Sequence, residues 1–237
     1  MIRLNKKVTI ICGHYGCGKT NLSINLAMDH SKEGKKTVLV DLDLVNPYFR
    51  SSDYREMMER RGIEVIIPVY AGTTLDVPAI APQVYSVLDG QDGDVIFDVG
   101  GDDAGATVLG RLSDQIRRLD YEMLYVINRY RTLTAEPEQA AALLKEIETA
   151  SRLRATAVVN NSHLKEQTGV QEILNSCAFA EKTASLLGLP LLFTTVPNTI
   201  APQLYEKVEN IYPISIYVRS PWETQNQEKE ILEWQGF

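Results

Sequence analysis

The sequence contains few cysteines and no long apolar run. Its three cysteines, Cys12, Cys17 and Cys177, are unevenly spaced and form no C-x-x-C pair. This pattern provides no zinc or iron–sulfur framework and is typical of a protein from a reducing compartment. No apolar run approaches the roughly 18 residues that a membrane helix requires. The short run at 8–11 that follows Lys6 and Lys7 is also too short for a signal peptide, so we predict a cytoplasmic protein.

Positive charge is scarce as well. The 237 residues include 24 Lys and Arg against 31 Asp and Glu, a formal net charge of −7. Strong nonspecific binding to nucleic acid or anionic lipid depends on clustered basic side chains, so this balance disfavours both. Another protein is the expected partner. The sequence also lacks a linker or low-complexity tract that would mark a boundary, and we predict a single domain over residues 1–237.

Short β-branched runs alternate with helical patterns along the whole chain. Such alternation is typical of an α/β fold with a doubly wound, mostly parallel sheet and crossover helices. Helical spacing is clearest for the apolar residues within 140–147 and 173–187. About seven strands are predicted: Val8 to Cys12, Thr37 to Asp41, Glu64 to Ile67, Val95 to Asp98, Met123 to Asn128, Ala155 to Asn160 and Leu191 to Val196.

One short segment nearly recurs. Residues 80–85 read IAPQVY, and residues 200–205 read IAPQLY. The flanking sequences do not match, so we interpret the pair as a coincidence of two helices that each begin at a proline, a residue favoured in the first turn. No function follows from the repeat.

The strongest motif directly follows the first predicted strand. Residues 13–20 read GHYGCGKT, which satisfies the phosphate-loop pattern G-x-x-x-x-G-K-[ST] between a strand and a helix. Glycines let backbone N–H groups converge on phosphate oxygens, and the helix N-terminus adds its positive dipole end. Lys19 is the expected catalytic charge at the β and γ phosphates, and the Thr20 hydroxyl the expected magnesium ligand. The predicted nucleotide-binding residues here are Gly13, His14, Tyr15, Gly16, Cys17, Gly18, Lys19, Thr20 and Asn21.

Acidic residues end two further predicted strands. Asp98 follows an apolar run, as in a Walker B strand, and is expected in the magnesium shell. Gly101 completes a D-x-x-G turn whose N–H could sense a γ phosphate. Asp41 and Asp43 form a D-x-D element after another strand. Because ligands of open α/β sheets bind at the carboxyl ends of strands, we expect both acidic elements at the nucleotide site.

These motifs together resemble the P-loop ATPases that include ParA, MinD, the nitrogenase iron protein and the arsenical pump ATPase. The resemblance covers most of the chain and implies ATP and Mg²⁺ as cofactors. It also implies that Asp43 positions the attacking water and that Asp41 lies on the magnesium side. The adenine base is expected at Asn160 or Asn161 and at Pro197 with its neighbours.

The chain departs from that group at two points. Members with the deviant loop carry a signature lysine directly after the first glycine, which reaches the partner's nucleotide across an ATP-sandwiched dimer. This chain has His14 there, and a neutral imidazole donates one hydrogen bond but no permanent charge. A nucleotide-dependent homodimer therefore stays an alternative. The cluster cysteines of the nitrogenase type are missing, so no iron–sulfur cluster is expected.

The sequence thus favours a Mg²⁺-dependent ATP-binding protein that cleaves ATP slowly. Loops at 43–50 and 101–103 would respond to the γ phosphate and act as a switch. One alternative is a small-molecule kinase on the same loop. Another is a non-hydrolysing, ATP-dependent assembly switch or cofactor-insertion chaperone. GTP also stays open, although the sequence has no N-K-x-D base motif.

Several side chains outside the motifs have two interpretations. Arg129 or Arg131, after a predicted strand, and Arg50, beside the D-x-D element, could stabilise a transferring phosphoryl group. A solvated loop is the main interpretation for each of them. His163 could lie near the base, but a surface-loop histidine is its main interpretation. The tail, about residues 220–237, is mostly acidic and is predicted to pack on the domain or on a partner, because interfacial membrane helices favour Lys and Arg.

Overall fold

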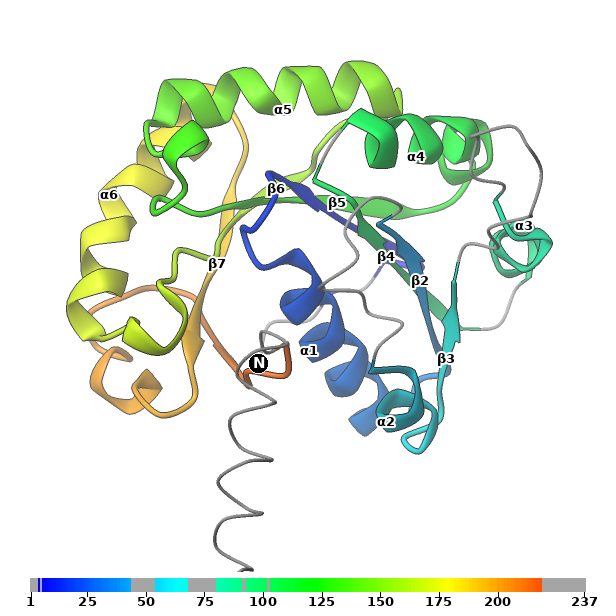
Figure 1. The fold of residues 1–237 in the computed structure, drawn as a ribbon, viewed down its shortest axis with the longest axis horizontal. Coiled ribbons are helices and arrows are strands. Elements are labelled where there is room, and N and C mark those ends of the chain that lie inside the picture. Colours follow the sequence, from blue (N-terminus) through cyan, green and yellow to red (C-terminus); the bar gives the residue numbers. More distant parts are fainter. Residues whose placement is uncertain are drawn as a thin grey trace, which may run out of the picture.

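A single parallel sheet organises the chain. The computed structural model describes residues 4, 6–43, 54–67, 80–90, 93–101 and 103–218. Within them, eight strands pair in the order β3-β2-β4-β1-β5-β6-β7-β8, and every pairing is parallel (Figure 1). The strands are β1 Val8–Gly13, β2 Thr37–Leu42, β3 Ile63–Ile66, β4 Asp94–Val99, β5 Tyr121–Ile127, β6 Ala157–Asn160, β7 Leu191–Pro197 and β8 Ile211–Ile214.

The doubly wound parallel sheet is confirmed, with one strand more than the predicted count of about seven. The additional strand, β8, pairs with β7 at the edge of the sheet. It is four residues long and contains Pro213. Proline cannot donate to the ladder, and strand prolines are therefore confined mainly to edges. Because the run is short and contains a proline, its sequence pattern did not predict a strand.

Helices cover both faces of the sheet. Figure 1 shows α4 and α5 on one side and α1 and α2 on the other. None of the helices in the described ranges is both long enough and apolar enough to cross a bilayer. The α-helices are α1 Lys19–Lys32, α2 Arg55–Glu59, α3 Pro82–Asp89, α4 Asp103–Ile116, α5 Pro137–Ser151 and α6 Val170–Leu187.

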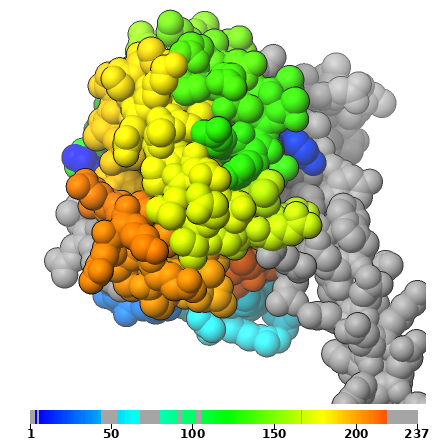
Figure 2. Space-filling model, turned by 90° about the vertical axis from the view of Figure 1, so that its left-hand side faces the viewer, coloured from blue at the N-terminus to red at the C-terminus, as the bar shows by residue number. Residues whose placement is uncertain are grey.

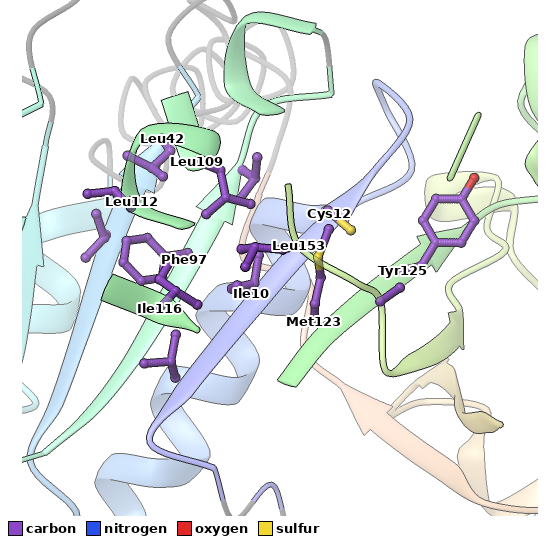
Figure 3. Packing of buried hydrophobic residues seen from close by; sticks show 14 of the residues in the cluster. Ile10, Cys12, Leu42, Phe97, Leu109, Leu112, Ile116, Met123, Tyr125 and Leu153 are labelled. Carbon is purple, nitrogen blue, oxygen red and sulfur yellow. The ribbon is translucent and has the colours of Figure 1, made fainter. Parts of the chain in front are cut away.

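The face beneath α3, α4, α5 and α6 holds the larger apolar cluster. Figure 3 shows Phe97 of β4 near Leu112 and Ile116 of α4, with Ile10 of β1 in the same cluster. Phe97 is fully buried. Burying a side chain of this size contributes roughly 2–3 kcal/mol. This packing fixes β4 beside β1, and both strands carry predicted site residues at their carboxyl ends.

The opposite face is packed by α1 and α2. Leu22, Ile24 and Met28 of α1 belong to one cluster with Ile96 of β4 and Leu124 of β5. All five side chains are almost completely buried. The helix that follows the phosphate loop is thereby held rigidly against the centre of the sheet.

A smaller apolar cluster closes one end of the sheet. Ile173 of α6 packs with Val196 of β7 and with Ala201 and Leu204. Figure 2 shows α6, in yellow, and the segment that follows β7, in orange, forming one continuous surface. This cluster holds the connection from β7 to β8 and so positions the edge strand.

The strand order reverses at β1. The chain passes from β1 to β2, which lies beyond β4, and later returns to β5 on the other side of β1. In open α/β sheets, ligands bind outside the carboxyl ends of the strands at such a switch point. The phosphate loop leaves β1 at this place.

The two nearly identical segments adopt different structures. Pro82 starts α3, as predicted, and occupies its first turn. Pro202 also lies in the first turn of a helix, but that helix, Ala201–Gln203, is a short 3₁₀ helix and not an α-helix. Buried Ala201 and Leu204 anchor the second segment in the cluster with α6. Tertiary packing therefore overrides the shared local sequence.

A close approach between α4 and α5 generates a stability prediction. A Cβ added to Gly110 would lie 2.5 Å from the Ala150 carbonyl oxygen. Alanine normally stabilises a helix interior relative to glycine by about 1 kcal/mol. We expect Gly110→Ala to lower the free energy of unfolding instead, by about 1–3 kcal/mol, because the backbones must move apart. Chemical denaturation measures this difference.

The matched control is Thr107→Ala on the exposed face of the same helix. It should change the free energy of unfolding by no more than about 0.5 kcal/mol. A Gly110→Ala protein at least as stable as the parent would contradict the packing argument.

Candidate functional site

The phosphate loop, residues 13–20, is built on backbone conformations that favour glycine. Gly13, Gly16 and Gly18 have φ values of 146°, 72° and 87°. The turn is closed by a hydrogen bond from the Cys17 N–H to the His14 carbonyl at 3.3 Å. Helix α1 then begins with no side-chain cap and no acidic residue in its first turn. Its free N–H groups and positive dipole end form an anion-binding arrangement.

Lys19 lies across this loop. Its side chain is buried, and Nζ donates to the His14 carbonyl oxygen at 3.0 Å. The His14 ring is partly exposed, and its Nδ1–H donates to the Tyr15 carbonyl at 2.8 Å. A buried ammonium beside an uncapped helix N-terminus concentrates positive charge at one place. Tyr15 is 53% exposed and therefore open to solvent.

Neighbouring strands hold the loop closely on both sides. A Cβ on Gly18 would lie 2.3 Å from Asn161 Nδ2 and 2.9 Å from His163 Nε2, both beyond β6. A Cβ on Gly101, beyond β4, would lie 2.4 Å from the Tyr15 nitrogen. Such distances leave no room for a side chain at either glycine. The loop after β4 therefore lies directly against the phosphate loop, where the D-x-x-G interpretation places it.

The acidic residues Asp41, Asp43 and Asp98 lie on the β4 side of β1, whereas β5 lies on its other side. Asp41 of β2 and Asp98 of β4 are register partners in adjacent strands, and both are completely buried. Asp43 is also buried, and its N–H donates to Asp41 Oδ1 at 2.9 Å. Burial, followed by the neighbouring Asp41 charge, raises the pKa of Asp98 to about 8, although Lys19 and a Thr20 hydrogen bond act in the lowering direction. The ionised forms of these buried carboxyl groups are therefore not stabilised by water.

This acidic group fits a divalent cation held together with phosphate oxygens. Asp98 Oδ1 accepts from the Ser23 hydroxyl at 3.2 Å, whereas the buried Oδ2 has no hydrogen-bond partner. A cation would relieve the repulsion between Asp41 and Asp98. Across the described ranges, no three His, Cys, Asp or Glu side chains are grouped to hold a metal by themselves. Mg²⁺ characteristically uses one or two carboxylates, phosphate oxygens and water, so this donor set suits it.

The two asparagines expected at the base have different environments. Asn160 is completely buried, and its Nδ2 donates to Ser176 Oγ at 2.9 Å. Asn161 Nδ2 donates to the Cys17 carbonyl at 2.6 Å, while its Oδ1 accepts from Thr195. Asn161 thus ties the phosphate loop to β7. Contact between either amide and a base stays a prediction, as does the role of Pro197, which ends β7 half-buried.

Asn21 faces a partner that sequence patterns did not suggest. Its Oδ1 accepts from the N–H groups of Tyr217 and Val218 at 2.8 and 3.2 Å. Its Nδ2 donates to the Ser215 carbonyl at 3.0 Å, and Asn25 bonds the same residue at 2.9 Å. The segment after β8 is therefore fastened to the first turns of α1. The side chain expected to bind nucleotide here holds the chain's own backbone.

Several predicted elements fall outside the described residues. They are Arg50, most of the loop at 43–50, Asp102 and the tail from residue 219 onward. Two residues interpreted as solvated lie at the loop instead. One is His163, which lies against Gly18. The other is Arg131, which lies against Gly16 of the phosphate loop, since a Cβ on Gly16 would lie 3.3 Å from the Arg131 guanidinium carbon. Their position after the carboxyl ends of β6 and β5 is the sequence signal that could have identified them.

The family model described as the CobQ/CobB/MinD/ParA nucleotide binding domain matches residues 8–216, from β1 to beyond β8. The chain belongs to this family. It is a ParA/MinD-like P-loop nucleotide-binding domain, and the resemblance drawn from its motifs is confirmed. A search of curated proteins found no match.

Solved structures show the same fold. One is the 54 kDa signal recognition particle protein of Aeropyrum pernix in complex with GDP, with 18% identity, a TM-score of 0.53 and coverage of 81% of this chain and 42% of that one. Another is FtsY of Thermotoga maritima, with 22% identity, a TM-score of 0.54 and coverage of 82% and 65%. This chain thus spans only 42% and 65% of the lengths of these two proteins. At such identities the likeness concerns the fold alone.

The environment of His163 generates a pH prediction. Burial, then the nearby charges of Arg131 and Lys165, lower the pKa of His163 to about 4, from 6.5. Below pH 6.5 the imidazole of His163 therefore binds a proton in the unfolded chain but not in the folded protein. Stability is lost as the pH falls from about 6.5 to about 4. His163→Asn should make this decline shallower, by at most about 1.4 kcal/mol per pH unit.

The measurement is chemical denaturation of both proteins between pH 8 and pH 4. The difference at pH 8, where the imidazole is neutral in both states, gives the cost of the substitution itself and serves as the control. Parallel stability curves over the whole range would contradict the assigned environment.

Proposed function

We propose that this domain binds ATP with Mg²⁺ and hydrolyses it slowly, as a nucleotide switch. The observation that carries the proposal is the arrangement of Lys19 between the uncapped N-terminus of α1 and the buried pair Asp41 and Asp98. Positive groups and carboxylates are thereby brought to the same site, where Lys19 acts on the pKa of Asp98. A magnesium-bound triphosphate has complementary charges, anionic along the phosphates and cationic at the metal.

Each group then has a defined task. The N–H groups of α1 and Lys19 Nζ bind phosphate oxygens, and Lys19 exchanges the His14 carbonyl for the nucleotide. Thr20 and Asp98, with Asp41 beside it, would hold magnesium, which when bound neutralises charge on the β and γ phosphates. Asp43 orients the attacking water. Its position, directly after β2 and braced by Asp41, places a carboxylate at the edge of this group.

The reaction requires no covalent intermediate. The water oxygen bonds to the γ phosphorus while Asp43 accepts a proton from the water, and the bond from that phosphorus to the bridging oxygen breaks. The products are ADP and phosphate, and Asp43 returns the proton to the phosphate. The electron pair stays on the bridging oxygen of ADP. Contact between Gly101 and the phosphate loop would let the segment after β4 respond to the loss of the γ phosphate. The expected recipient of that response is a protein partner.

Lys19→Ala tests nucleotide binding. Removing a buried, charge-assisted hydrogen-bond donor costs about 1.5–3 kcal/mol, so affinity for Mg·ATP should fall roughly 10- to 100-fold. Isothermal calorimetry measures it, and Mg·GTP is titrated in parallel because a structure of the same fold contains GDP. The matched control is Lys32→Ala, an exposed lysine at the other end of α1. Absence of nucleotide binding by the parent protein would overturn the proposal.

Asp43→Asn tests hydrolysis separately. The amide keeps the size of the carboxylate but cannot accept a proton, so kcat should fall on the order of 100-fold or more. Affinity for the nucleotide should change little. Phosphate release under saturating Mg·ATP is the measurement, and Asp114→Asn, at an exposed site on α4, is the control. Normal turnover by the Asp43 variant would remove this residue from the mechanism.

A further inference from the structure

Arg131 occupies a place at the phosphate loop that no motif assigns to it. The Gly16 backbone and the Arg131 side chain are in contact, since a Cβ on Gly16 would lie 3.3 Å from both Cζ and Nε of the arginine. Burial raises the pKa of the Cys17 thiol and lowers that of His163; the same guanidinium is close enough to oppose the first shift and to add to the second. These three neighbours place it on the β5 side of the loop, opposite the acidic group.

Arg131 is half-buried, and its side chain lacks the partners that such arginines normally have. Its Nε is buried without a hydrogen-bond partner, and its side chain forms no ion pair within the described ranges. Arg129, two residues earlier, is exposed and donates through Nη1 to the Asn175 carbonyl at 3.0 Å. A buried donor atom of a charged group is normally paired, because leaving it unpaired is unfavourable. An anionic group bound at this place would remove that cost.

The surroundings of Arg131 are positively charged. Lys19 and Arg131 both act on Cys17, and Arg131 and Lys165 both act on His163. The N-terminus of α1 adds its dipole from the same direction. Acidic side chains at the loop, Asp41, Asp43 and Asp98, come from β2 and β4 on its other side. Arg131 thus lies among other cationic groups at the phosphate loop.

The turn that carries Arg131 is held in place by hydrogen bonds. Asn128 Oδ1 accepts from the Tyr130 N–H at 2.9 Å and from the His163 N–H at 3.3 Å. The Tyr130 hydroxyl donates to the Glu172 carbonyl at 2.7 Å, and the Arg131 N–H donates to the Asn128 carbonyl at 3.2 Å. The turn is therefore fixed to both β6 and α6. An arginine on such a turn needs little reorganisation to meet a ligand.

We propose that Arg131 contacts the phosphates of the bound nucleotide from within the same chain and stabilises the charge of the transferring phosphoryl group. The proposal rests on the function proposed above. Arginine suits the task because its charge is permanent and its planar fork matches phosphate oxygens. During hydrolysis it neither gives nor takes a proton. It stabilises negative charge while the bond from the γ phosphorus to the bridging oxygen breaks.

The experiment compares Arg131→Gln and Arg131→Lys with the matched control Arg129→Gln. With Mg·ATP, kcat of Arg131→Gln should fall on the order of 10³-fold, the effect typical of a phosphoryl-stabilising arginine. Arg131→Lys should retain part of the rate, and added guanidinium should partly restore Arg131→Gln. Arg129→Gln should stay within about threefold of the parent, a change below about 0.7 kcal/mol. Calorimetric affinities for AMP, ADP and a nonhydrolysable triphosphate should show a loss that grows with the number of phosphates.

A merely structural role would give a different result. The substitution would then weaken the binding of all three nucleotides equally, and guanidinium would not restore turnover. This result would overturn the proposal. A kcat of Arg131→Gln equal to that of Arg129→Gln would overturn it as well. Mixing Arg131→Gln with Lys19→Ala distinguishes the source of the arginine, because restored turnover would show that it acts from a second copy. That result would overturn the same-chain assignment.

Failure of the proposed function has its own signature. If the parent binds no nucleotide, the function fails before Arg131 is tested. If the parent binds a triphosphate but does not cleave it, the hydrolytic role of Asp43 fails. The affinity of the Arg131→Gln variant for the triphosphate then tests whether Arg131 contacts the phosphates. A loss of about tenfold in Arg131→Gln, or 1.4 kcal/mol, supports phosphate contact. Equal affinity in the Arg131 and Arg129 variants overturns it.

Discussion

The close packing of the phosphate loop between neighbouring strands is the constraint on which the site depends. A Cβ on Gly13 would lie 2.2 Å from the Val126 carbonyl oxygen of β5, and one on Gly18 would lie 2.3 Å from Asn161 Nδ2 beyond β6. A Cβ on Gly101, which lies beyond β4, would lie 2.4 Å from the Tyr15 nitrogen of the loop. The loop therefore cannot shift without moving the sheet. Since apolar clusters on both faces fix the sheet, the free N–H groups at the start of α1 are held in position before any ligand arrives.

Charge is separated across this loop. The carboxyl groups of Asp41 and Asp98 come from β2 and β4, whereas the Arg131 guanidinium and the uncharged His163 ring follow β5 and β6. The separation follows from strand order, because β1 lies between the two groups in the sheet. Each group alone is unfavourable, as the raised pKa of Asp98 and the lowered pKa of His163 both indicate. A ligand with a cationic and an anionic part would relieve both at once, which no simple ion would do.

Sequence patterns predicted the layers and the loop because those depend on local signals. Buried strands give β-branched runs, and the glycines with Lys19 form a motif whose spacing is fixed by geometry. Side-chain partners were harder, because they depend on register between distant segments. Asn21 carries a motif position but bonds the segment after β8, 194 to 197 residues away. Arg131 and His163 resemble ordinary loop residues until strand order brings them to the loop.

The bonds of Asn21 connect the nucleotide site to the end of the described chain. Asn21 and Asn25 lie on the first turns of α1, directly after the loop that would close on phosphates, and both bind the segment at 215–218. Tyr217 and Val218 also pack on the cluster beneath α1. A shift of the first turn of α1 would therefore pull on this segment. These part-buried hydrogen bonds would transmit such a shift because breaking them leaves polar groups less well satisfied, so the helix whose N-terminus would bind the anion also fixes the position of residues 215–218.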